Sequence, residues 1–78
     1  MKSVVINLNM AESVKQFVNI VSSYDFDVDL RQGKFVVNAK SILGIFSLDL
    51  NKPVIIEIFA GLEEAEKIID ELDAFVVK

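Results

Sequence analysis

The side chains that could carry chemistry in this sequence are carboxylates, hydroxyls and amines, because the chain contains neither histidine nor cysteine. There is consequently no imidazole to act as a base or a metal ligand, and no thiol to act as a nucleophile or to form a disulfide. Asp27 and Asp29 alternate along one predicted strand, but no activated nucleophile, metal-ligand motif or glycine-rich phosphate loop accompanies them. We therefore expect a protein that is not an enzyme and that uses no metal and no cofactor.

The size and charge of the chain limit which classes of partner it can bind. Its 78 residues correspond to one small domain, residues 1–78, and 53% hydrophobic residues supply a dense core. Twelve acidic and eight basic side chains give a net charge of −4, which disfavours nucleic acid and anionic membranes. No segment approaches the ~18 apolar residues of a membrane span, and the first residues lack the apolar core of a signal peptide. We expect a cytoplasmic, soluble protein whose partners are other proteins.

Hydrophobic periodicity predicts the elements that position these side chains. Apolar residues alternate, as is typical of strands, in residues 3–8, 26–31, 34–39 and 54–60. They recur with helical spacing in residues 10–22, 41–48 and from 62 to the end of the chain. Gly33 is expected to form the turn of a hairpin between the second and third strands. Asn9 and Glu12 match a capping box at the start of the first helix.

The strands predict the arrangement of the layers, because each has one apolar face and needs cover on that face only. The expected fold is α+β, an open-faced two-layer sandwich of order β-α-β-β-α-β-α. It has a four-stranded antiparallel sheet with three helices on one face. Leu62, Ala65, Ile68, Ile69, Leu72 and Phe75 form the apolar stripe of the last helix. The other sheet face stays open, with Val5, Ile55 and Phe59 pointing outward.

Two stretches of the sequence carry a family resemblance: YDFDVDLRQGKFVVNAKS and KSILGIFSL. In the first, an aromatic residue and Asp leave the first helix and a hairpin follows. In the second, a K-S-I-x-G-x-x-S-L segment starts the second helix. This arrangement resembles the HPr family, the histidine-containing phosphocarriers of the bacterial sugar phosphotransferase system, and covers most of the chain. The matching positions are Tyr24, Asp25, Lys40, Ser41, Ile42, Gly44, Ser47 and Leu48.

The resemblance places Met10 where the family has its phosphoacceptor histidine, and Glu12 where it has an arginine. A thioether has no acceptor chemistry comparable to that of a neutral imidazole nitrogen. A carboxylate repels the phosphoryl oxygens that an arginine would bind. The hypothesis is therefore an HPr-like protein in which Met10 and Glu12 mark a former phosphohistidine site that cannot carry a phosphoryl group.

Ser41 matches the serine that the HPr kinase/phosphorylase phosphorylates in Gram-positive members of the family, where the modification serves regulation. A phosphate at a helix N-terminus meets free backbone amides and the positive end of the helix dipole. Serine is also a preferred N-cap residue. Two interpretations of Ser41 therefore stay open: a cap alone, and a cap that is also a phosphorylation site. Ser47 is interpreted as a hydroxyl at the helix end.

Leu43 and Phe46 match positions at which the family's second helix presents an apolar patch to partners, close to the start of the first helix. Together with Met10 they form a candidate partner-binding surface, because methionine adapts to varied surfaces. The alternative is that Phe46 packs inward. The resemblance implies the HPr kinase/phosphorylase or a transcription regulator as partner, with a role in catabolite repression.

Two functions follow from the sequence. The favoured one is a regulatory or adaptor protein that binds partner proteins, with Ser41 as its candidate control point. The alternative is a self-association domain that has diverged from the phosphotransferase system and forms a homodimer through the open sheet face. Val5, Ile55 and Phe59 motivate this alternative.

Overall fold

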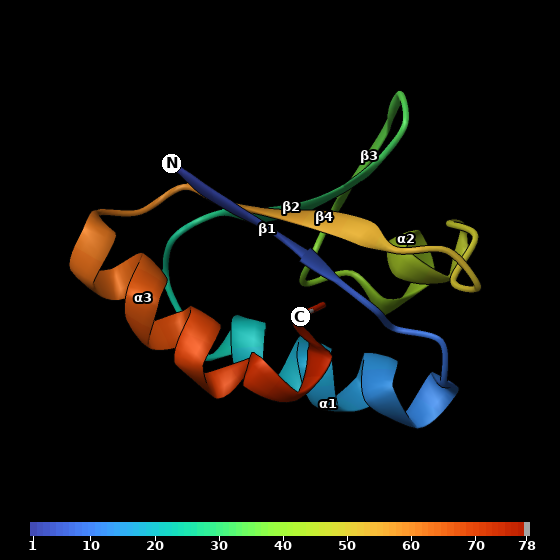
Figure 1. The fold of residues 1–78 in the computed structure, drawn as a ribbon, viewed down its shortest axis with the longest axis horizontal. Coiled ribbons are helices and arrows are strands. Elements are labelled where there is room, and N and C mark those ends of the chain that lie inside the picture. Colours follow the sequence, from blue (N-terminus) through green and yellow to red (C-terminus); the bar gives the residue numbers. More distant parts are fainter. Residues whose placement is uncertain (78) are drawn as a thin grey trace.

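The computed structural model describes residues 1–77, which form a sheet covered on one side by helices (Figure 1). The elements are β1 (Lys2–Ile6), α1 (Ala11–Ser22), β2 (Val28–Gln32), β3 (Phe35–Asn38), α2 (Ile42–Phe46), β4 (Val54–Ile58) and α3 (Leu62–Glu71), followed by a 3₁₀ turn over Asp73–Phe75. The strand order is β1-β4-β2-β3, and all neighbouring strands are antiparallel. The predicted open-faced sandwich is confirmed.

The core lies between the inner face of the sheet and the helices. On the sheet side, Ile56 of β4 pairs with Val4 of β1 and with Leu30 of β2, and both Ile56 and Leu30 are fully buried. On the helix side, the buried residues are Val14, Phe17 and Val21 of α1 and Ala65 and Ile68 of α3. Full burial of a Val, Leu, Ile or Phe side chain contributes roughly 1.5–3 kcal/mol. These positions follow the strand and helix periods from which the elements were predicted.

The start of α1 differs from the predicted capping box. The helix begins at Ala11 with Met10 as its N-cap, and within residues 1–77 no side chain caps this end. A capping box between Asn9 and Glu12 would require Asn9 to be the N-cap, so this prediction is wrong. The physical reason is that Leu8 is buried in the core, which keeps the chain extended up to Met10.

The end of the chain also differs from its prediction. α3 ends at Glu71 rather than at the last residue, and Lys78 lies outside the described residues. After the 3₁₀ turn, Val76 forms an antiparallel bridge with Ile6, and the Val77 amide donates to the Val5 carbonyl at 2.9 Å. Pairing with β1 thus replaces the last turns of the predicted helix. Leu62, assigned to the apolar stripe, is 65% exposed because it lies at the first position of α3.

The hairpin between β2 and β3 has the predicted glycine turn. Gln32 pairs with Phe35, so the loop contains only Gly33 and Lys34. Gly33 has a φ of +61°, and no other residue type within residues 1–77 has a positive φ. A positive φ at Gly33 without one at Lys34 is the pattern of a type II′ rather than a type I′ turn, and its twist matches that of the strands.

The second face of the sheet is not covered by a helix (Figure 1). Val5, Ile55 and Phe59 are exposed there, and Val5 and Ile55 are direct cross-strand neighbours, so their predicted outward orientation is confirmed. The centre of this face is polar. The Arg31 guanidinium donates to both carboxylate oxygens of Glu57, at 3.1 and 3.2 Å, and Glu57 is almost completely buried.

Leu62, the first residue of α3, and Leu72, the residue that follows its last, provide a matched test of burial along the predicted apolar stripe. Leu72→Ala should lower the free energy of unfolding by about 2–5 kcal/mol, because Leu72 is fully buried. Leu62→Ala should change it by less than about 0.5 kcal/mol, because the side chain is mostly exposed. Urea unfolding followed by circular dichroism measures both values. Similar losses in the two variants would contradict this burial pattern.

Candidate functional site

The residues that the sequence analysis singled out lie on α1 and α2, two helices that contact each other. In Figure 1 the start of α1, in blue, and α2 lie toward the same end of the molecule. Met10, the N-cap of α1, is 62% exposed, and Glu12 is exposed in the first turn of the same helix. An acidic residue at this position stabilises α1, because it faces the positive end of the helix dipole.

Ser41 is the N-cap of α2, as the sequence predicted. Its Oγ accepts a hydrogen bond from the Gly44 amide at 3.1 Å, and its carbonyl accepts one from the Ile45 amide at 3.0 Å. Gly44 is needed for close packing at this point. A Cβ on Gly44 would lie 3.3 Å from both the Ser41 Oγ and the Val37 Cβ of β3. The glycine of the sequence motif therefore allows α2 to pack tightly against β3.

Lys40 fixes the segment that enters α2. Its ammonium group donates to the Tyr24 carbonyl at 2.7 Å, and its amide donates to Asn38 Oδ1 at 2.8 Å. The Ser41 amide donates to the Asn38 carbonyl at 3.0 Å. The lysine that precedes the serine in the motif thus binds backbone at the end of α1, which holds the start of α2 in place.

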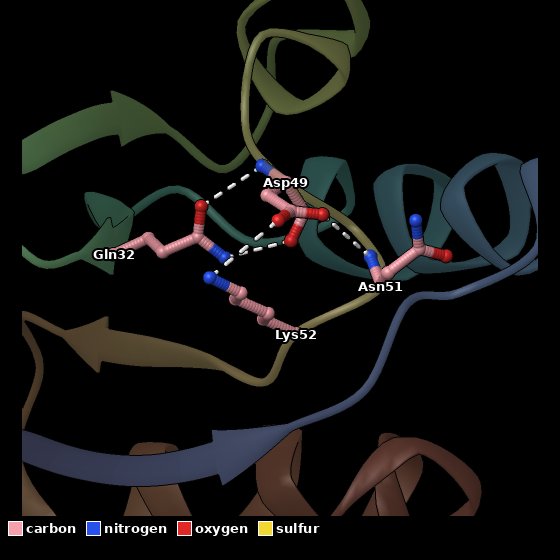
Figure 2. Close-up of polar contacts among 4 residues, drawn as sticks. All are labelled: Gln32, Asp49, Asn51 and Lys52. Carbon is pink, nitrogen blue, oxygen red and sulfur yellow. Dashed lines mark hydrogen bonds and ion pairs between the residues drawn. The ribbon is translucent and has the colours of Figure 1, made fainter.

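Gln32 fixes the segment that leaves α2, and Figure 2 shows its side-chain amide facing Asp49. The Gln32 amide donates to the Asp49 carbonyl at 2.7 Å and accepts from the Asp49 amide at 2.8 Å. The Asp49 carboxylate in turn accepts from the Asn51 amide at 3.1 Å and lies 3.9 Å from the Lys52 ammonium. Ser47 donates to the Gly44 carbonyl, as its interpretation as a helix-end hydroxyl predicts.

The outer side of α2 is apolar and exposed. Leu43 is 84% exposed, Phe46 is 46% exposed and Ile42 is partly exposed, whereas Ile45 is buried. We call Ile42, Leu43 and Phe46 the α2 surface. Phe46 is therefore not packed inward, as the alternative interpretation had it. Helical spacing in residues 41–48 would place Ile42, Ile45 and Phe46 on one apolar face, but only Ile45 is buried, because α2 has only five residues.

This region presents an exposed apolar surface. The structure contains no cavity within the residues it describes, and no group of carboxylates within residues 1–77 is arranged to hold a metal ion. None of the helices formed by these residues is both long and apolar enough to cross a bilayer. The exposed side chains of α2 are aliphatic and aromatic groups on the helix that Ser41 caps, which suits contact with another protein.

Sequence reasoning missed the contacts that hold α2 in place. Lys40 and Gln32 both bind backbone groups that are distant in sequence, at Tyr24 and Asp49. Such contacts leave no periodic signal, since the partner is a main-chain atom that any residue type supplies. Lys40 was noticed only as part of the family motif, and nothing in the sequence around Gln32 pointed to Asp49.

Comparisons with known proteins agree with this geometry. Residues 10–78 match the family PTS-HPr, described as PTS HPr component phosphorylation site. A crystal structure of HPr-C-His from Thermoanaerobacter tengcongensis is 30% identical with a TM-score of 0.75, covering 92% of this chain and 90% of that one. A phosphocarrier protein HPr from Bacillus anthracis is 28% identical with a TM-score of 0.71, covering 97% and 94%. A search of curated proteins found no match.

Proposed function

Because the chain belongs to the HPr family of the phosphotransferase system, we propose that it is a protein-binding, regulatory member of that family that cannot act as a phosphohistidine carrier. The observation that carries the proposal is the absence of histidine from the chain, together with the sequence resemblance, which places Met10 at the family's phosphoacceptor position. We place this protein in the cytoplasm, as its membership of the HPr family implies.

The chemistry at the start of α1 supports the loss of phosphoryl transfer. Met10 is exposed, so a donor protein can reach it, but attack by a thioether would leave sulfur with three substituents and a positive charge that no proton loss can relieve. An imidazole avoids this, because its second nitrogen releases a proton. Glu12 adds a negative charge in the first turn of α1, where the phosphoryl group would have to bind.

The α2 surface supports partner binding. Leu43 and Phe46 expose apolar area on a short helix whose entry is fixed by Lys40 and whose exit is fixed by Gln32. A fixed surface loses little conformational freedom when a partner binds, which favours affinity. Met10 on the adjacent helix would extend this surface. From the family resemblance, we infer that the partner is the HPr kinase/phosphorylase or a transcription regulator, in catabolite repression.

Ser41 is the control point in this proposal. Transfer of the γ-phosphoryl group of ATP to the Ser41 Oγ would release ADP and the hydroxyl proton, with a kinase supplying the catalytic groups. The phosphate oxygens would accept hydrogen bonds from the first amides of α2, which the Oγ now does through the Gly44 amide. The added charge would lie two positions from Leu43, beside the α2 surface, where it would select between partners.

Self-association through the open sheet face stays a prediction, and partner binding is better supported. Val5 and Ile55 are exposed neighbours on that face. The Arg31–Glu57 ion pair lies beside them, however, and Asp29 is directly opposite Glu57. Burying this polar centre against a second copy would require every charge to find a partner. The α2 surface carries no such cost.

The proposal is tested by comparing two phosphoryl donors, phosphoenolpyruvate and ATP. Incubation with phosphoenolpyruvate and enzyme I should add no phosphoryl group, whereas ATP with HPr kinase/phosphorylase should add one, at Ser41. Intact mass spectrometry measures both, and the Ser41→Ala variant should remain unmodified under either condition. A phosphorylated wild-type product with phosphoenolpyruvate would contradict the carrier argument. An unmodified protein with ATP and the kinase would contradict the role of Ser41.

Docking on the α2 surface is tested by a matched pair of leucines. Leu43→Asp should lower kcat/KM for phosphorylation by the kinase by about tenfold or more, because it places a charge in a buried interface. Leu62→Asp should leave this value unchanged, because it lies on α3. Both substitutions lie in the first turn of a helix, where an acidic residue is tolerated. Equal losses in the two variants would rule out a specific docking role for Leu43.

A further inference from the structure

The two edges of the sheet are covered to different degrees. Along β1, the Asn7 amide donates to the Phe75 carbonyl at 2.8 Å, and Ile6 forms a bridge with Val76. Along β3, no strand formed by residues 1–77 pairs with the outer side. β3 is Phe35-Val36-Val37-Asn38, without the charges or proline that protect exposed edges in other proteins. In Figure 1 the hairpin that carries β3 extends away from α1 and α3.

The register of the hairpin determines which backbone groups face the free side. A two-residue turn is closed by a hydrogen-bonded pair, and such pairs then alternate along the ladder. Phe35 and Val37 therefore direct their N–H and C=O groups toward β2, and Val36 and Asn38 direct theirs outward. The Asn38 carbonyl has this outward direction, because it accepts a hydrogen bond from the Ser41 amide rather than from an amide of β2.

We propose that the free edge of β3 pairs with β3 of a second copy of this chain, antiparallel, with Val36 opposite Val36. In this register the outward N–H and C=O of each Val36 bond reciprocally to those of the other copy. The Asn38 amide of each copy faces the Lys34 carbonyl of the other. Residues directly opposite each other point to the same side of a sheet. The two sheets therefore become continuous, and their open faces lie on one side.

A second copy is favoured as the occupant because the edge is complementary to itself. On the helix side, Phe35, which is 64% exposed, would lie opposite Val37, which is partly buried. On the open side, the exposed Val36 would lie opposite itself. Each copy has a net charge of −4, yet β3 has no charged residue, and Lys34 would lie opposite Asn38. The pairing brings no like charges together.

The interface is small, which defines the expected behaviour. β3 has four residues, so pairing buries less than the roughly 1,200 Å² of a stable complex, and association should depend on concentration. This inference does not rest on the proposed function, since it uses the β3 edge rather than Met10, Ser41 or the partner contact of Leu43.

Charge placed at Val36 tests the pairing. Val36→Lys and Val36→Glu should each weaken self-association by about tenfold or more, because like charges would lie opposite each other. An equal mixture of the two variants should associate at least as tightly as the wild-type protein, since Lys would then lie opposite Glu. Sedimentation equilibrium over a range of concentrations measures each sample, and circular dichroism verifies that the variants are folded.

Phe59→Lys is the matched control, because it adds the same charge on the open face beyond the end of β4. It should leave self-association unchanged. A wild-type protein that stays monomeric at all concentrations would overturn the proposal, and so would a mixture that fails to restore association. Loss of the dimer in Phe59→Lys together with its retention in Val36→Lys would assign the contact to the open face instead.

Discussion

The burial of one face of the sheet is the constraint on which the rest of this structure depends. Ile56, at the centre of β4, lies between Val4 and Leu30, and helices from distant parts of the sequence cover this row. A chain of 78 residues has room for one such layer, so the second sheet face and the β3 edge remain open. The open sheet face, the β3 edge, Met10 and the α2 surface all lie outside this single core.

Because the core is buried under one face of the sheet, the residues that hold the fold together differ from those at the start of α1. The side chains that hold the sandwich together are buried, whereas Met10 and Glu12 are exposed at the start of α1. A substitution at this exposed position removes no core contact, and Glu12 stabilises the first turn of α1. α2 is held at both ends by Lys40 and Gln32, and neither contact needs a phosphohistidine. The proposed partner surface on α2 therefore does not depend on the carrier reaction.

The elements of the fold were predictable because their periods reflect burial against one layer. Phe17 and Ile68 occupy positions that helical spacing assigns to the core, and both are fully buried. The errors occur where a distant segment decides the local structure. Asn9 is not a cap, because the buried Leu8 sets where α1 can start. The predicted last helix ends early, because Val76 pairs with β1.

The candidate site was predictable only in part, for a different physical reason. Ser41 could be recognised as a cap, because its hydroxyl bonds to an amide three residues ahead, and that spacing is visible in the sequence. The exposure of Ile42 could not be predicted, because a helix of five residues is too short for hydrophobic periodicity to define its buried face. The contact between Gln32 and Asp49 joins a side chain to main-chain atoms 17 positions away, and it is set by the tertiary structure alone.

The central claim is that the residues at the start of α1, and not the scaffold, prevent phosphoryl transfer. The most direct measurement is transfer from phosphoenolpyruvate through enzyme I to a folded Met10→His, Glu12→Arg variant beside the wild-type chain. The account predicts an acid-labile phosphoryl group on the double variant, less on Met10→His alone, and none on the wild type. Phosphorylation of the wild type to the same extent as the double variant would contradict it, and so would a folded double variant that accepts nothing.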